Sequence, residues 1–81
     1  MEKDLGIDNI EQRVLLLGLY KAQKDESFLD ILKTMENSNV FTIKTGKKYL
    51  KNLKELQYIT DDSLTFLGIE KAKEIELEFR L

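Results

Sequence analysis

The 81-residue sequence contains no cysteine, no histidine, no proline and no tryptophan. Without cysteine the chain has neither a disulfide framework nor a thiolate metal site, which fits a reducing cytoplasm. Without histidine or cysteine, its serines have no imidazole to activate them and no thiolate can act instead. Because a glycine-rich phosphate loop is also missing, we expect neither enzymatic activity nor a cofactor.

Long apolar segments are missing as well. The longest apolar run, from Val14 to Tyr20, spans seven residues and is interrupted by Gly18. A membrane-spanning helix needs about 20 such residues. The first eight residues, MEKDLGID, are charged and lack the apolar segment of a signal peptide. We therefore expect one domain, residues 1–81, in the cytoplasm and without a membrane partner.

Positive charge is concentrated in one segment of this acidic chain, whose formal net charge is −2. Residues 1–40 and residues 59–81 each carry a net charge of −3, whereas residues 41–58 carry five lysines and one glutamate, a net charge of +4. A local basic surface is what phosphate binding requires. Lysine also forms helices well on a solvated face, so the charge pattern alone leaves both interpretations open.

Capping signals and apolar spacing predict helices separated by short turns. Asp8 with Glu11 and Ser27 with Asp30 resemble capping boxes. Thr42 suits the N-cap of a third helix, and Asn37 or Asn39 can end the second. The expected elements are an N-terminal arm at 1–7, helices at 9–23, 28–36 and 42–56, a hairpin at 58–66 and a helix at 67–78.

The expected hairpin gives the fold class, which is mainly α with a small β-hairpin. Residues 58–60 and 64–66 suit strands, and Asp61, Asp62 and Ser63 suit the turn between them. In the tail, residues 75–81 alternate between apolar and charged side chains. This alternation fits a strand, but we favour a continued helix because the hairpin offers little sheet to extend.

The helix expected at 42–56 has two distinct sides. At about 100° per residue, Leu50, Leu53 and Leu56 share one side with Tyr49 and Gly46. Lysines at i, i+3, i+4 and i+7 cover a sector of roughly 100° that lies about 150° from the leucines. We expect Tyr49 to pack in the core and these lysines to face solvent: Lys44, Lys47, Lys48 and Lys51.

Two sequence segments resemble those of winged helix-turn-helix domains, in the small bacterial and archaeal regulators of the MarR or ArsR kind. YLKNLKELQYI, residues 49–59, is similar to a recognition helix that runs into the first wing strand. LTFLGIEKA, residues 64–72, is similar to the LT-x-x-G-x-x-x-A start of the helix after the wing. The resemblance covers about residues 8–76, and it implies a three-helix core with a wing and a C-terminal helix.

The chain departs from this family at three places. Gln57 stands where these proteins usually have glycine, so the third helix must end without that residue. Phe66 and Leu67 stand where charged residues are usual. The expected wing tip is Asp61 and Asp62, whose carboxylates would repel a phosphate backbone. Two carboxylates are also too few oxygen ligands for a cation site, and we expect no metal.

The resemblance implies a DNA-binding transcriptional regulator or accessory factor. In this fold the exposed face of the third helix enters the major groove. Lysine holds phosphates well but distinguishes bases less well than arginine, so we expect modest sequence specificity. The acidic wing tip favours the alternative, a protein-interaction module that uses its lysines to bind an acidic partner. The implied contacts with double-stranded DNA are Thr42, Lys44, Thr45, Lys47, Lys48 and Lys51.

Apolar residues near the end of the chain exceed what one helix can bury against a small core. They either form a deep local core or the interface of a homodimer, because exposed apolar patches mark interaction sites. The candidate interface residues are Phe66, Leu67, Leu77, Phe79 and Leu81.

Overall fold

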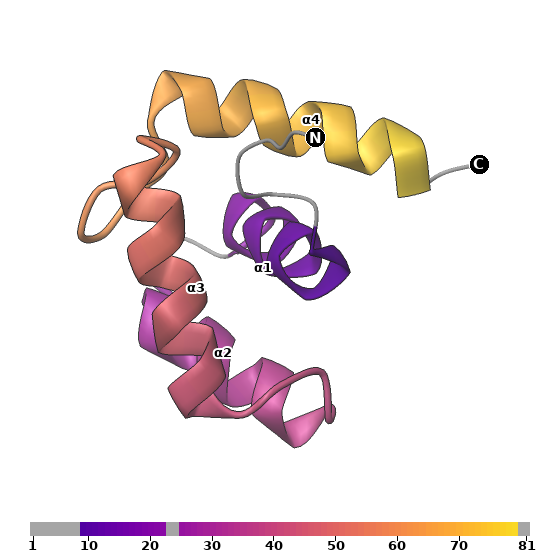
Figure 1. Cartoon of the computed structure of the whole chain (residues 1–81), viewed down its shortest axis with the longest axis vertical. Coiled ribbons are helices and arrows are strands. Elements are labelled where there is room, and N and C mark those ends of the chain that lie inside the picture. The colour runs from indigo at the N-terminus through magenta and orange to yellow at the C-terminus, as the bar shows by residue number, and fades with distance from the viewer. Residues whose placement is uncertain (1–8, 23–24, 80–81) are drawn as a thin grey trace.

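The computed structural model describes residues 9–22 and 25–79, and in this part of the chain it contains four helices. They are α1 (Ile10–Tyr20), α2 (Phe28–Asn37), α3 (Ile43–Glu55) and α4 (Phe66–Phe79). α1 packs against α2, α3 and α4, and α2 also packs against α3 (Figure 1). The mainly α class is therefore confirmed. The expected arm at 1–7 lies outside the described residues.

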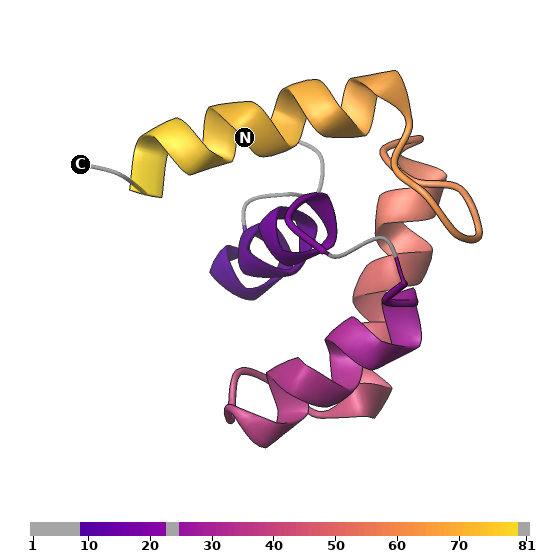
Figure 2. The same ribbon diagram turned by 180° about the vertical axis from the view of Figure 1, so that it is seen from behind.

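The expected β-hairpin and its wing are wrong, because residues 58–66 do not form two strands. A single antiparallel bridge joins Ile59 to Leu64 and closes the loop that links α3 to α4 (Figure 2). The reason lies in Thr65, whose hydroxyl accepts a hydrogen bond from the Gly68 N–H (3.0 Å) and donates one to the Gln57 carbonyl (2.7 Å). Thr65 thus caps α4, so Phe66 begins a helix where a second strand was expected.

Gly68 holds the start of α4 close to this loop. A Cβ atom at residue 68 would overlap the carbonyl oxygen of Tyr58, so any larger residue would push α4 away. The same carbonyl accepts a hydrogen bond from the Thr65 N–H at 3.0 Å. These two contacts hold the start of α4 against Tyr58, just after α3, so the connection between the two helices is a short closed loop. In the tail, α4 continues to Phe79, which agrees with a helix rather than a strand.

Side-chain caps fix where the first three helices begin. Ser27 and Asp30 form the expected capping box of α2, and Thr42 caps α3 by accepting the Thr45 N–H at 3.2 Å. At α1 the N-cap is Asn9, whose side-chain oxygen accepts from the backbone N–H groups of residues 11 and 12. The expected partner of Glu11 in a capping box, Asp8, lies outside the described residues.

Two left-handed residues end α2 and α3. Asn39 has φ 62° and Gln57 has φ 69°. After Asn39, the Val40 N–H donates to the Met35 carbonyl at 2.9 Å, and after Gln57, the Tyr58 N–H donates to the Leu53 carbonyl at 3.0 Å. These six-residue closures are Schellman motifs. Asn39 ends its helix as expected, and Gln57 adopts the conformation that glycine usually takes.

The core lies where α1 meets the other three helices. Leu53, on the inner side of α3, has no exposed surface and packs with buried residues of α1 and α2. α2 and α3 approach closely at Gly46, where a Cβ atom would lie 2.6 Å from Cδ2 of Leu32. Two large apolar residues of α1 and α2 lie outside this core and are exposed, Ile10 at 59% and Leu29 at 44%. The buried apolar residues are Leu15, Leu16, Leu19, Ile31, Leu32, Phe41, Leu53, Ile59, Ala72 and Ile75.

Candidate nucleic-acid interface

The lysine stripe, defined as Lys44, Lys47, Lys48 and Lys51, lies on the solvent side of α3. All four lysines are exposed, and Leu53 on the other side of the helix is fully buried. Within residues 9–22 and 25–79, none of the four forms an ion pair. Their backbone positions span about 10 Å along the helix axis at 1.5 Å per residue. The stripe is therefore a continuous positive surface available to an anionic partner.

The N-terminus of α3 is already engaged by the protein itself. The Thr42 hydroxyl oxygen accepts the Thr45 N–H and donates to the Thr45 hydroxyl at 3.1 Å. The Ile43 N–H donates to Oε2 of Glu36, from the end of α2, at 3.2 Å. A carboxylate at this position satisfies the positive end of the helix dipole. It also opposes a phosphate there, so lysine side chains are better placed than the helix terminus to hold a DNA backbone.

Tyr49 connects α3 to α1 and to the turn before α3. The ring of Tyr49 packs edge-on against Phe41, with centroids 5.4 Å apart and planes at 80°. Its hydroxyl donates to Oε1 of Glu11 at 2.7 Å. This hydrogen bond, with burial and the nearby carboxylate charge, raises the pKa of Tyr49. Tyr49 thus belongs to the packing side of α3, as the sequence predicted, and turns the lysines outward.

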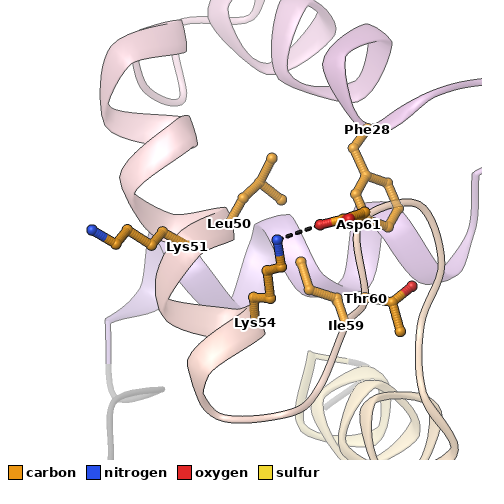
Figure 3. A pocket seen from close by; sticks show the side chains of 7 residues that line it. All are labelled: Phe28, Leu50, Lys51, Lys54, Ile59, Thr60 and Asp61. Atoms are coloured by element: carbon orange, nitrogen blue, oxygen red, sulfur yellow. Dashed lines mark hydrogen bonds and ion pairs between the residues drawn. The ribbon is translucent and has the colours of Figure 1, made fainter.

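A small hollow borders the lysine stripe at the C-terminal half of α3 (Figure 3). Its volume is about 210 Å³, and Lys51 lines one side of it. Lys54 forms an ion pair with Asp61 across the hollow, and this lowers the pKa of the Asp61 carboxyl. Ligand pockets usually measure about 300–1,000 Å³, so the hollow is too small for a drug-sized ligand. The remaining lining residues are Phe28, Leu50, Ile59 and Thr60.

The loop at 60–63 therefore carries one carboxylate that is paired with α3 and one that is not. Asp61 is neutralised by Lys54, which leaves Asp62 as the loop carboxylate without a lysine partner among the described residues.

No group of three or more acidic or other metal-ligating side chains gathers in the described ranges. In these same ranges, none of the helices has the length and apolar character needed to cross a membrane.

The apolar residues expected to form a dimer interface are spread over two sides of α4. Phe66 is 79% exposed and Leu77 is 65% exposed, and these two lie on the side of α4 that faces away from the core. Leu67 and Phe79 are also exposed, but the winding of the helix places Phe79 near the buried side with Ala72. Leu81 lies outside the described residues.

Two residues that shape this surface were not predicted from the sequence. Glu36 was not expected at the N-terminus of α3, because its contact crosses the turn between α2 and α3. Glu11 was expected only as part of a cap, yet it holds the Tyr49 hydroxyl of a distant helix. No spacing rule connects either pair, since each contact depends on how two helices pack. Glu11 lies in the first turn of α1 and Glu36 in the last turn of α2, and neither position signals its contact in the sequence.

Comparisons with protein-family models, with curated proteins and with solved structures find no match to this chain. The resemblance to winged-helix regulators therefore rests on the residues quoted above, without the wing.

Proposed function

We propose that the protein binds duplex DNA through the lysine stripe, as a small transcriptional regulator or accessory factor of the cytoplasm. The observation that carries the proposal is the placement of four exposed lysines on the face of α3 opposite the buried Leu53. α2 and α3, joined by the turn at 38–42, supply the helix-turn-helix part of the resemblance. In such motifs the second helix meets the major groove.

Phosphate contacts dominate this mode of binding. The lysine stripe has no arginine to form a bidentate pair with guanine. Lysines neutralise the phosphates of DNA regardless of its base sequence, so the affinities for unrelated duplexes should be similar. The short loop at 60–63 carries two aspartates and adds no cation that could reach a second groove. The proposal is thus for weakly specific binding by α3 alone.

The test is binding of a labelled random duplex at low salt, measured by fluorescence anisotropy. The variant Lys47→Glu/Lys48→Glu should lose binding, because it reverses half of the lysine stripe. A charge-matched control, Lys21→Glu/Lys71→Glu, changes an exposed lysine just after α1 and a partly exposed lysine on α4, and it should retain binding. Circular dichroism would check that each variant is folded.

The alternative partner, an acidic protein surface, is distinguished by the same variants. If the wild-type protein does not bind duplex DNA more tightly than Lys47→Glu/Lys48→Glu does, the DNA proposal is abandoned. Retention of a polyglutamate peptide by the wild type but not by this variant would then favour an acidic protein partner.

A further inference from the structure

One side of α4 presents a stripe that faces away from the core. We define the α4 outer stripe as Phe66, Glu70, Lys73 and Leu77, which follow a spacing of four, three and four residues. At about 100° per residue these four positions fall within a sector of roughly 60°. They lie about 160° from the buried positions Gly68, Ala72 and Ile75.

The apolar side chains at both ends of this stripe are exposed to solvent. Phe66 is 79% exposed and Leu77 is 65% exposed, and they lie about 16 Å apart along the helix axis. Between them, Glu70 and Lys73 are about half exposed and approach each other at 3.9 Å within the same helix. The stripe thus has an apolar residue at each end and one charge of each sign in the middle.

The α4 outer stripe is complementary to the same stripe of a second copy that runs in the opposite direction. Phe66 and Leu77 have the same midpoint along the helix as Glu70 and Lys73, between residues 71 and 72. A two-fold axis through this midpoint sets Phe66 opposite Leu77 of a second copy. The same axis sets Glu70 opposite Lys73 of that copy, and Lys73 opposite its Glu70. Two-fold interfaces require this kind of self-complementary surface.

A parallel pairing of the same stripes would not be complementary. It would place Glu70 against Glu70 and Lys73 against Lys73, and like charges in facing positions oppose association. The spacing of four and three residues is that of the seam between two packed helices, and charges that flank such a seam select orientation. In the α4 outer stripe the two charged residues, Glu70 and Lys73, lie in the seam itself. Charge complementarity therefore identifies both the occupant and its direction.

We propose that the protein forms a homodimer in which the α4 outer stripes of two copies pack antiparallel. Phe66 and Leu77 of opposite copies form an apolar contact at each end, and two Glu70–Lys73 ion pairs lie between these contacts. The interface is on α4, whereas the lysine stripe is on α3, so the dimer does not depend on the proposed DNA binding. Four apolar side chains make a small interface, and we expect a reversible, concentration-dependent dimer.

The test is sedimentation equilibrium of the full chain over a range of protein concentrations. The wild type should dimerise, and Leu77→Ala should raise the dissociation constant by about tenfold or more, because it removes one partner from the apolar contact at each end of the interface. A matched control, Leu29→Ala, removes an exposed leucine of α2 and should leave the dissociation constant unchanged. Both residues are exposed, so both variants should retain the helical content of the wild type.

Charge exchange tests the direction of the pairing. Glu70→Lys alone and Lys73→Glu alone should each weaken self-association by about tenfold, because each sets like charges opposite each other. Mixing these two variants should restore a dimer, since the lysines of one face the glutamates of the other. The double variant Glu70→Lys/Lys73→Glu should also dimerise as the wild type does.

Two outcomes would overturn the proposal. One is a wild-type protein that stays monomeric throughout the concentration range. This result would mean that a second copy does not bind the α4 outer stripe. The other is a dimer whose dissociation constant does not respond to Leu77→Ala or to single charge reversal, which would place the interface elsewhere.

Discussion

The hydroxyl of Tyr49 on α3 donates a hydrogen bond of 2.7 Å to Oε1 of Glu11 on α1. The two residues are 38 positions apart in the chain, and their contact joins the packing side of α3 to α1. Since the lysine stripe lies on the other side, this hydrogen bond helps to determine where the positive charge is presented.

The Tyr49–Glu11 contact predicts a pH dependence at high pH. A carboxylate beside the hydroxyl favours the protonated tyrosine, and the folded pKa is raised above its ordinary value, which is about 10. The contact therefore stabilises the fold fully below that value, and this contribution is lost as pH rises through the folded pKa. In a spectrophotometric titration, Tyr49→Phe should remove an ionisation that lies above the ordinary tyrosine pKa.

The same variant should lower stability modestly. Loss of the hydroxyl should reduce the free energy of unfolding at neutral pH by about 0.5–1.5 kcal/mol. Glu11→Gln provides the control, because it keeps an acceptor but removes the charge and should return the pKa of Tyr49 toward its ordinary value. A Tyr49→Phe protein that shows the wild-type alkaline titration would contradict the assignment.

Leu53 is predicted to be a major core residue of α3. Its side chain is completely buried, so Leu53→Ala should lower the free energy of unfolding by about 2–5 kcal/mol, through lost burial and a cavity. The matched control is Leu29→Ala on α2, where the side chain is 44% exposed and the cost should be below about 0.5 kcal/mol. Urea unfolding measures both. Equal effects at the two positions would mean that α3 is wrongly oriented.

Gln57 is predicted to destabilise the fold because its backbone is left-handed. Its φ of 69° is unfavourable for a residue with a Cβ atom. Gln57→Gly should therefore raise the free energy of unfolding by about 0.5–1 kcal/mol, after the larger entropy loss of glycine is included. Lys33→Gly, inside α2 on its exposed side, should instead lower it by about 0.8–1.0 kcal/mol. In thermal unfolding, the midpoint temperature should rise for Gln57→Gly and fall for Lys33→Gly.

Glu36 is predicted to weaken DNA binding. Its carboxylate accepts the Ile43 N–H at the start of α3, where it would repel a phosphate near the lysine stripe. Glu36→Gln should raise the affinity for a random duplex by about two- to fivefold at low salt, which corresponds to the usual worth of one charge at a helix terminus. Glu74→Gln on α4 makes the same charge change far from α3 and should have little effect. Weaker binding by Glu36→Gln would contradict the proposed position of the phosphates.

Local signals in the sequence predicted much of the helical fold. Ser27 and Asp30 form the expected capping box, and Thr42 caps α3 as expected, because caps involve residues that are close in sequence. The two sides of α3 also followed from helical periodicity, which placed Leu53 inside and the lysine stripe outside.

Features that depend on packing between elements were not predictable in this way. Residues 64–66 have strand-forming side chains, yet the Thr65 hydroxyl donates to the Gln57 carbonyl after α3, and the carbonyl of Tyr58 lies against Gly68 of α4. These tertiary contacts outweighed the local preference and removed the hairpin. The exposed positions of Ile10 and Leu29 likewise depend on which neighbours reach each helix face, and periodicity does not report that.

The most direct test of the central proposal is the salt dependence of binding to a random DNA duplex. If all four lysines of the stripe neutralise phosphates, the logarithm of the association constant should fall with the logarithm of salt concentration at a slope of roughly −3.6. With two lysines reversed in Lys47→Glu/Lys48→Glu, the slope should be no steeper than about −1.8. A wild-type slope near zero, or an unchanged slope in the variant, would contradict DNA binding by the lysine stripe.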